Sequence, residues 1–416
     1  MNIAIIDTDL IGRKSHRFPN LCSMKISGYH KEQGYNVELI TDYKDLYLDS
    51  NTWNEYQDAI LKYSKNQNNK TSELLREKMI PCFKKESFKY DKIFISKVFT
   101  DTEIDEDFLK LDFVEYGGTG FTYDKAPDIP YEIEHHIPDY HLYDDWVNLM
   151  IESGQNKKDF EYYLDYSIGY LTRHCFRGCF FCVNKNYKKV DFNTSVKEFL
   201  DTSRKYICLL DDNILGYSDW KSVIDELINT KKYFVFKQGM DIRLMTDEKA
   251  AILSKCKYRG DYIFAFDDIK DRDSIEKKLE LWRKYCKKTT KLYVFCGFED
   301  SVQDIISTFE RIKILMKYGC LPYIMRHENY IKNKFFGTYI NLARWCNQPN
   351  FFKKKSYREY CQANQDRTKV RECSAVRYLK ELEELYPEIA KEYYDLKYEK
   401  LNKYSNTNKT RKKKIQ

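Results

Sequence analysis

Short apolar runs that recur at a nearly constant interval constrain the fold of this chain more than any other feature. After a first, longer interval they return about every 27 to 30 residues, which is the length of one strand followed by one helix. The runs are Tyr166–Leu171, Tyr206–Leu210, Phe234–Phe236, Tyr262–Phe266, Leu292–Phe295 and Pro322–Met325. They predict a partial parallel barrel of six strand–helix units over residues 159–330, because a full barrel of this type has eight units.

The segments between these runs have the period of an α-helix. The two clearest apolar faces are Ile275, Leu279, Trp282 and Cys286 in one segment, and Val302, Ile305, Phe309 and Ile312 in another. Ser301, Thr246 and Asp273 are candidates for helix N-caps, and Gly319 is a candidate for a helix end.

Residues 1–125 predict a second α/β domain with an open, Rossmann-like sheet. Its expected strands are the runs Ile3–Ile6, Val37–Ile40, Ile93–Ser96 and Phe113–Tyr116. A helix is expected over Asn20–Gln33, and Gly34 would end it. The glycine-rich segment Gly117–Gly120 follows the last strand, and it allows either a close approach of the backbone to a ligand or a tight turn.

The remaining segments are interpreted from their composition. The polar stretch 42–90 is expected to be an insertion with helical pieces. Residues 126–158 contain several prolines and are expected to link the two domains. Residues 331–404 predict a charged helical extension with a break at Pro387, and residues 405–416 predict a disordered basic tail.

Composition and charge exclude several classes of protein. The net charge of +7 is a weak lean towards acidic partners and does not by itself indicate a nucleic-acid-binding protein. No apolar stretch reaches the roughly 18 residues that span a bilayer. Asp7 and Asp9 interrupt the apolar N-terminus, so no signal peptide is expected. We therefore expect a cytoplasmic protein, in which closely spaced cysteines indicate a metal or a catalytic site rather than disulfides.

Three of the 13 cysteines follow one another at close spacing, directly after the first strand of the predicted barrel. Cys175, Cys179 and Cys182 have the pattern C-x3-C-x2-C. Barrel enzymes place their chemistry at this end of the strands. Three thiolates suit a 4Fe-4S cluster with one iron left open. The alternatives are a structural zinc site, which prefers four ligands and paired C-x2-C halves, and coincidental packing.

The segment CFRGCFFC, including the aromatic Phe181 before the third cysteine, resembles the signature of the radical S-adenosylmethionine (SAM) superfamily. The resemblance implies a 4Fe-4S cluster whose open iron binds SAM through its amino and carboxylate groups. An electron, supplied by a donor such as flavodoxin or ferredoxin, then cleaves SAM to methionine and a 5′-deoxyadenosyl radical that acts on a substrate. The resemblance identifies neither the substrate nor a catalytic side chain.

Polar residues at the ends of the second and third strands are candidates for binding SAM. Asp211 and Asp212 could accept hydrogen bonds from its ammonium group, or they could serve as a helix cap in the loop. Gln238, Asp241 and Arg243 follow the third strand, and Arg243 could bind the SAM carboxylate as a fork. The alternative for this pair is an internal Asp241–Arg243 salt bridge.

The N-terminal domain resembles the cobalamin-binding-type domain that precedes many radical SAM domains. Cobalamin proteins of the histidine-ligated kind carry Asp-x-His-x-x-Gly after the first strand, and the corresponding segment here is Asp7–Gly12. Asp9 occupies the histidine position, so cobalt ligation by histidine is not expected. Cobalamin binding without a protein ligand stays open. The alternative is a degenerate domain that covers the barrel mouth or binds substrate.

The remaining cysteines bear on the kind of radical enzyme. The related methylthiotransferases carry a second cluster on N-terminal cysteines, and Cys22 and Cys82 are too few for that activity. Cys346, Cys361 and Cys373 could hold an auxiliary cluster, although their spacing is loose. A function from another class also stays open, namely a non-catalytic metal-binding adaptor, with zinc or an iron–sulfur cluster, that binds nucleic acid through its basic tail.

Overall fold

A computed structural model describes residues 1–13, 15–65, 82 and 84–404. The predicted basic tail lies outside the described residues. The chain divides into two compact units, each built from several segments. The first unit comprises Met1–Leu171, Arg177–Lys188 and Asn193–Cys208, and the second comprises Thr172–Phe176, Lys189–Phe192 and Leu209–Gln416.

The first unit contains the open parallel sheet that the sequence predicts. Its strands are β1 (Asn2–Asp7), β2 (Asn36–Ile40), β3 (Lys92–Ser96) and β4 (Val114–Gly117), in the order β2-β1-β3-β4. All three strand pairs are parallel. The chain moves to one side of β1 for β2 and to the other side for β3. The carboxyl ends of β1 and β3 therefore form a topological switch point, where open α/β sheets bind ligands.

Helix α2 (Leu21–Glu32) begins and ends where the sequence predicts. The side chain of Asn20 caps it by accepting a hydrogen bond from the N–H of Ser23 at 3.1 Å. Gly34, with φ of +79°, follows its last turn, in the left-handed conformation that favours glycine.

The two faces of β1 are both buried, as expected for a parallel strand covered on both sides. Ile3 and Ile5 are buried on one face, and α2 packs against β1, β2 and β3. Ala4 and Ile6 point to the opposite face because side chains alternate along a strand. They join a core formed by Ile40, Leu46, Tyr47, Phe88, Tyr90, Ile93, Ile95, Phe108 and Val114.

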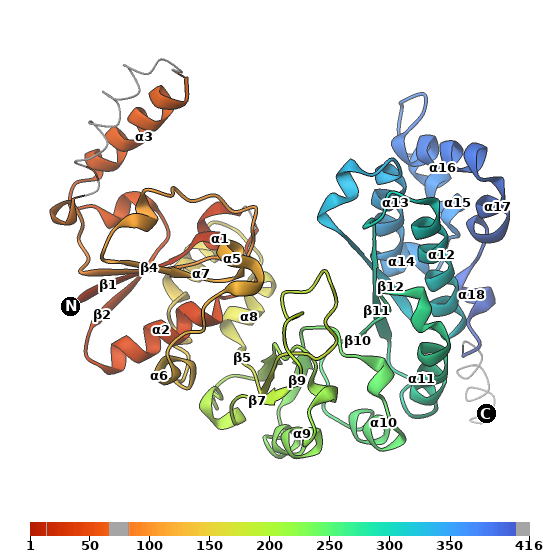
Figure 1. Ribbon diagram of the computed structural model, residues 1–416, viewed down its shortest axis with the longest axis horizontal. Helices are drawn as coiled ribbons and strands as arrows, with labels where there is room; N and C mark the ends of the chain where they lie inside the picture. Colours follow the sequence, from red (N-terminus) through yellow and green to blue (C-terminus); the bar gives the residue numbers. More distant parts are fainter. Residues whose placement is uncertain (14, 66–81, 83, 405–416) are drawn as a thin grey trace. The chain divides into compact units, whose positions relative to one another are not determined.

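The first unit also contains several helices outside this sheet. The predicted insertion contains α3 (Ser50–Lys65), which extends away from the sheet in Figure 1; part of this insertion lies outside the described residues. The other α-helices among the described residues of this unit are α1 (Thr8–Gly12), α5 (Thr119–Thr122), α6 (Tyr131–Glu134), α7 (Asp144–Glu152) and α8 (Glu161–Leu164).

The proline-containing segment 126–158 packs against the first unit. The hydroxyl of Tyr140 donates a hydrogen bond to the carbonyl of Phe199 at 2.6 Å, and the N–H of Asp139 donates to the carbonyl of Met24 at 2.9 Å. The segment therefore belongs to the fold of this unit, and helices α6 and α7 lie within it.

The strands predicted after residue 160 are all present. They are β5 (Tyr166–Gly169), β8 (Tyr206–Leu209), β9 (Tyr233–Phe236), β10 (Tyr262–Ala265), β11 (Thr290–Cys296) and β12 (Leu321–Arg326). In the first unit β8 lies beside β5. The last residue of β8, Leu209, belongs to the second unit. Its carbonyl accepts a hydrogen bond there from the N–H of Lys237, which directly follows β9.

In the second unit β10, β11 and β12 form a parallel sheet. Two parallel bridges, Phe234 with Tyr258 and Met240 with Phe264, connect the β9 segment to β10. The α/β class with parallel sheets is therefore confirmed, whereas closure of these strands into a partial barrel stays a prediction.

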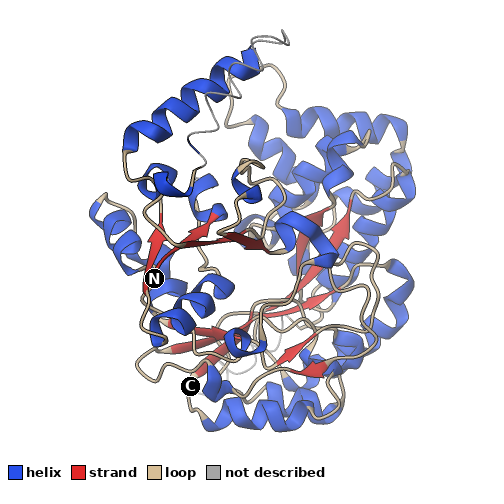
Figure 2. Cartoon of the chain, turned by 60° about the vertical axis from the view of Figure 1, so that its left-hand side comes forward, coloured by secondary structure: helices blue, strands red, loops and turns tan. Residues whose placement is uncertain are grey.

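Helices alternate with the strands of this unit along the chain, and Figure 2 shows them in blue. They are α9 (Trp220–Asn229), α10 (Asp247–Leu253), α11 (Arg272–Tyr285) and α12 (Val302–Lys317). Along β11 every second residue is buried, and α12 packs against this strand. The opposite face carries Tyr293 and Phe295, which are only partly buried.

The predicted N-caps are right in two cases and wrong in one. The side chains of Ser301 and Thr246 cap α12 and α10. Asp273 is not a cap, because a preceding 3-10 turn capped by Asp268 starts the helical path earlier and α11 begins at Arg272. Gly319, with φ of +65°, follows α12 as predicted.

The C-terminal extension is helical, as predicted. Its helices are α13 (Phe336–Cys346), α14 (Pro349–Phe352), α15 (Tyr357–Gln365), α16 (Ser374–Leu385), α17 (Pro387–Ile389) and α18 (Tyr398–Leu401). The break between α16 and α17 falls before Pro387, because proline has no N–H to continue the helix. Within the part of the chain that the structure describes, no helix is long and apolar enough to span a membrane.

Candidate functional site

The three motif cysteines lie on a loop whose two ends are joined. Strand β6 (Thr172–Arg173) pairs antiparallel with β7 (Asp191–Phe192), and both strands belong to the second unit. The loop between them, residues 174–190, contains neither helix nor strand. We call this segment the cluster loop. Its backbone takes positive φ at His174 (73°) and Gly178 (59°), so the chain turns sharply on both sides of the first cysteine.

The side chains of the three motif cysteines are partly exposed. The amide of Asn213 donates a hydrogen bond to the sulfur of Cys175 at 3.4 Å, and the N–H of Asn184 donates to the sulfur of Cys182 at 3.4 Å. The N–H of Cys182 also donates to the carbonyl of Cys179 at 2.9 Å, which closes a tight turn between these two residues. Most of the other cysteines are buried: Cys82, Cys208, Cys286, Cys296, Cys320, Cys346 and Cys361.

This donor set fits an iron–sulfur cluster. Iron–sulfur clusters are held by cysteine thiolates, and hydrogen bonds to the sulfurs tune their potential. Among the described residues, no group of three or more His, Cys, Asp or Glu side chains converges on a single metal ion. A cubane differs from such a site because each thiolate binds a different iron. The three cysteines lie within eight consecutive residues of the chain, of which Cys175 belongs to the second unit and Cys179 and Cys182 to the first.

The first predicted SAM-binding pair, Asp211 and Asp212, holds the start of the cluster loop. Asp211 is buried, and its carboxylate accepts hydrogen bonds from the N–H of Thr172 at 2.6 Å and from its hydroxyl at 2.7 Å. Asp212 accepts a hydrogen bond from the N–H of His174 at 2.8 Å. Neither carboxylate caps a helix, since the residue at the cap position of the following 3-10 turn is Asn213.

The second predicted set lies beyond β9. The strand ends at Phe236, and farther along the chain Asp241 caps a 3-10 turn over Ile242–Leu244. Arg243 donates from Nε to Asp241 at 2.8 Å and from Nη1 to Asp271 at 2.5 Å. The internal salt bridge is therefore present. Gln238 is exposed between β9 and this turn.

No role was predicted from the sequence for two further polar residues near the strand ends. Asn213, which contacts the first cysteine, is 38 residues away in the sequence. Arg311 is fully buried on α12, and its Nη1 donates hydrogen bonds to the carbonyls of Phe266, Asp267 and Phe295 at 2.8–3.1 Å. It thereby ties together the ends of β10 and β11. Burial also raises the pKa of Asp267 to about 6. No sequence pattern distinguishes Arg311 from an exposed arginine.

In the first unit, the side chain of Asp9 is hydrogen-bonded to other residues of the protein. It is buried, and its carboxylate accepts hydrogen bonds from the N–H of Val98 at 2.7 Å and from the hydroxyl of Thr102 at 2.5 Å. It joins the loops that follow β1 and β3. The residues at this position therefore do not fit histidine-ligated cobalamin, as the sequence predicts.

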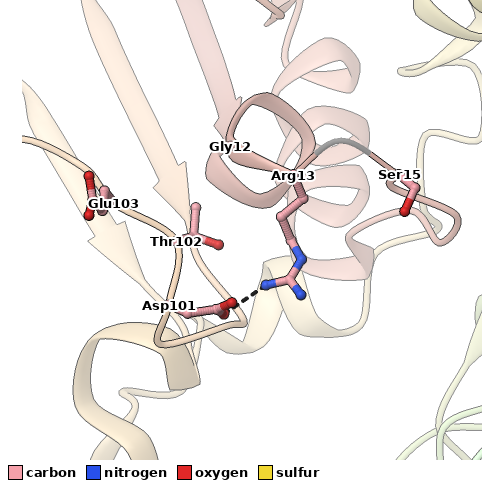
Figure 3. Close-up of a pocket in the computed structure, with 6 residues that line it drawn as sticks. All are labelled: Gly12, Arg13, Ser15, Asp101, Thr102 and Glu103. Carbon is pink, nitrogen blue, oxygen red and sulfur yellow. Dashed lines mark hydrogen bonds and ion pairs between the residues drawn. The ribbon is translucent and has the colours of Figure 1, made fainter. Parts of the chain in front are cut away.

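A cavity of about 540 Å³ lies at the switch point between β1 and β3. It is lined by Gly12, Arg13, Ser15, Asp101, Thr102 and Glu103 (Figure 3). Nη1 of Arg13 donates to Asp101 at 2.7 Å, and its guanidinium lies 4.1 Å from the centre of the Phe99 ring. The lining is polar and comes from both loops, as expected of a ligand site in a sheet of this order.

The residues predicted to hold an auxiliary cluster lie on separate elements. Cys346 is buried on α13 and Cys361 on α15, whereas Cys373 is partly exposed before α16. Burial raises the pKa of Cys361 to about 12 and that of Cys346 well above its usual value. A thiolate is the form that binds metal, so burial disfavours ligation at these two positions.

Comparison with known proteins gives no match to any family model and no match among curated proteins. Among solved structures, the chain is similar to the radical SAM methyltransferase TsrM from Kitasatospora setae, determined with cobalamin and a 4Fe-4S cluster bound. The two are 10% identical with a TM-score of 0.47, over 78% of this chain and 74% of TsrM. It is also similar to the cobalamin-dependent SAM radical enzyme OxsB, determined with aqua-cobalamin and SAM bound, at 11% identity and a TM-score of 0.36, over 97% of this chain and 58% of OxsB.

Proposed function

We propose that this chain is a radical SAM enzyme in which Cys175, Cys179 and Cys182 hold a 4Fe-4S cluster. The observation that carries the proposal is the CFRGCFFC segment, whose three cysteines are partly exposed on one loop that follows the first strand of the predicted barrel. When bound, the cluster supplies the electron that cleaves SAM reductively to methionine and a 5′-deoxyadenosyl radical. A flavodoxin or a ferredoxin is the proposed electron donor.

The chain's own residues then hold and tune this centre. The hydrogen bonds to the sulfurs of Cys175 and Cys182 withdraw electron density from the thiolates, which favours the reduced state. Asp211 and Asp212 fix the backbone where the cluster loop begins. Supporting contacts of this kind orient metal ligands and are part of the site.

We infer that SAM binds at the carboxyl ends of β8 and β9, with contributions from Asp211, Asp212, Gln238, Asp241 and Arg243. Gln238 is exposed there, and Arg243 is ion-paired with Asp241 at 2.8 Å. The SAM carboxylate would take the place of Asp271 on Nη1 of Arg243, because that ion pair is the more exposed of the two. This arrangement implies that the parallel strands of residues 166–326 curve into a partial barrel.

We propose that cobalamin, if the first unit binds it, occupies the cavity at the switch point without a nitrogen ligand from this loop. Asp9 is held by Val98 and Thr102. Nδ1 of His16 lies 2.5 Å from the hydroxyl of Tyr163, so this nearby imidazole is also engaged within the protein.

Anaerobic reconstitution with iron and sulfide tests the proposed function. The chain should become brown and bind about four irons, the content of one cubane. It should then form 5′-deoxyadenosine from SAM in the presence of dithionite. A colourless protein with one tightly bound zinc would contradict the proposal and favour the adaptor class.

A further inference from the structure

The glycine-rich segment after β4 is bound closely to the loop after β3. Gly118 has φ of +112°, and a Cβ there would collide with the carbonyl oxygen of Lys97. The N–H of Gly120 donates a hydrogen bond to the same carbonyl at 3.0 Å. These glycines therefore serve a close approach between two segments of the chain's own backbone. They fix the position of α5 and of the 3-10 turn Tyr123–Lys125 that follows it.

Tyr123 directs its hydroxyl onto the cluster loop. It ends α5 with φ of 51° and ψ of −106°, a conformation that L-residues rarely adopt and that is retained where the surroundings impose it. Its hydroxyl donates a hydrogen bond to the carbonyl of Phe181 at 2.6 Å. Phe181 lies between Cys179 and Cys182, so this bond fixes the peptide inside their turn.

Asp124 holds the next part of the same loop. Its Oδ2 accepts from Nζ of Lys185 at 3.0 Å and from the amide of Asn186 at 3.2 Å. The Asp124 side chain is only 16% exposed, and the hydrogen bond from Lys185 lowers the pKa of its carboxyl. Nζ of Lys185 also lies 5.7 Å from the centre of the Tyr123 ring. All of these residues belong to the first unit.

We propose that Tyr123 and Asp124 are positioning residues that hold Cys179 and Cys182 in the conformation in which they bind the cluster. The inference rests on the proposed function. The hydrogen bond from the N–H of Cys182 to the carbonyl of Cys179 closes the turn, and the bond from Tyr123 anchors Phe181, one of the two residues between them. Holding the loop before the cluster binds removes much of the conformational entropy that ligation would otherwise have to overcome. The N-terminal α/β domain thereby contributes to the metal site whether or not it binds a corrinoid.

Amide hydrogen exchange of the iron-free chain tests the contact directly. Tyr123→Phe removes only the hydroxyl, and Asp124→Asn removes only the charge. The loss of one such hydrogen bond should accelerate exchange of the Cys182 and Asn184 amides about fivefold. Tyr131→Phe is the matched control, because Tyr131 belongs to the same unit and is 72% exposed. In this variant the amides of the cluster loop should exchange at the rate of the parent chain. Unchanged exchange in both test variants would overturn the inference.

The reconstituted chain gives a second readout. In Tyr123→Phe, iron should be lost to a chelator about fivefold faster than in the parent, and the electron paramagnetic resonance spectrum of the reduced cluster should broaden. Asp124→Glu should restore the parent behaviour that Asp124→Asn loses, while thermal melting stays unchanged in all variants. A parent that takes up no iron contradicts the proposed function. In that case, amide hydrogen exchange in the iron-free chain still decides whether the contacts from Tyr123 and Asp124 hold the cluster loop.

Discussion

Replacing Asp7 with asparagine should reveal a pH dependence of stability that the parent chain does not show. Asp7 is buried at the end of β1, where it accepts a hydrogen bond from the hydroxyl of Tyr143 at 2.9 Å. It lies 3.9 Å from Nε2 of His16. Burial raises the pKa of Asp7 from 3.8 to about 7, and burial lowers the pKa of His16 from 6.5 to about 4. The other ionisable groups around the pair are Asp9, Arg13, Tyr43, Tyr143 and Tyr163.

The two shifts act on stability with opposite signs. Asp7 stabilises the fold below pH 3.8, and this contribution of about 4 kcal/mol is lost as the pH rises to about 7, at about 1.4 kcal/mol per pKa unit. His16 stabilises the fold above pH 6.5, and its contribution of about 3 kcal/mol is lost as the pH falls to about 4, by the same conversion. Between these limits the folded pair binds one proton, on Asp7, and the unfolded pair also binds one, on His16. The net effect in the parent is therefore close to zero.

Urea unfolding of the full chain between about pH 4 and 6.5 measures the difference. In Asp7→Asn the His16 contribution remains alone, so the free energy of unfolding should rise by about 3 kcal/mol over this range. In His16→Gln only the Asp7 contribution remains, so the free energy of unfolding should instead fall as the pH rises. His141→Gln serves as the control because the His141 side chain is 77% exposed. If Asp7→Asn retained the pH profile of the parent, the cancellation between the raised pKa of Asp7 and the lowered pKa of His16 would be refuted.

Four further outcomes are expected. Alanine at each of the three motif cysteines should abolish formation of 5′-deoxyadenosine, whereas Cys286→Ala should preserve it and lower the free energy of unfolding by about 1 kcal/mol, as measured in urea. Arg311→Met should lower the free energy of unfolding by about 3 kcal/mol in the same assay, because three backbone carbonyls lose the donor that the buried guanidinium supplies; a loss below about 1 kcal/mol would contradict this role. Any bound cobalamin should show no protein nitrogen on cobalt by electron paramagnetic resonance, because Asp9 replaces the histidine. Removal of residues 405–416 should leave iron content and SAM cleavage intact, and a loss confined to nucleic-acid affinity, with steep salt dependence, would favour the adaptor class.

The positions of the strands could be predicted because their signal is local. Runs such as Ile93–Ser96 are apolar and bounded by polar residues, and the observed β3 differs from that run by one residue. The wrong N-cap at Asp273 arises where another side chain redirects the backbone. The 3-10 turn capped by Asp268 shifts the start of α11 to Arg272.

Contacts between distant residues could not be predicted. Prolines make residues 126–158 resemble a linker, yet the hydroxyl of Tyr140 is hydrogen-bonded to Phe199, 59 residues away. At the candidate site, the three thiols were found because their spacing is encoded within eight residues. Asn213 and Tyr123, which contact this loop from 38 and 58 residues away, left no comparable signal.

The division of the chain has a consequence for how its parts can be studied genetically. Between residues 171 and 209 the polypeptide passes from one compact unit to the other five times. No single point of truncation therefore yields either unit complete. A fragment that stops at Leu171 would lack two segments of its own unit, Arg177–Lys188 and Asn193–Cys208. Gene fusions or expressed fragments that split the chain at this point are expected to aggregate, and a circular permutant with new ends elsewhere is the better route to dissecting it.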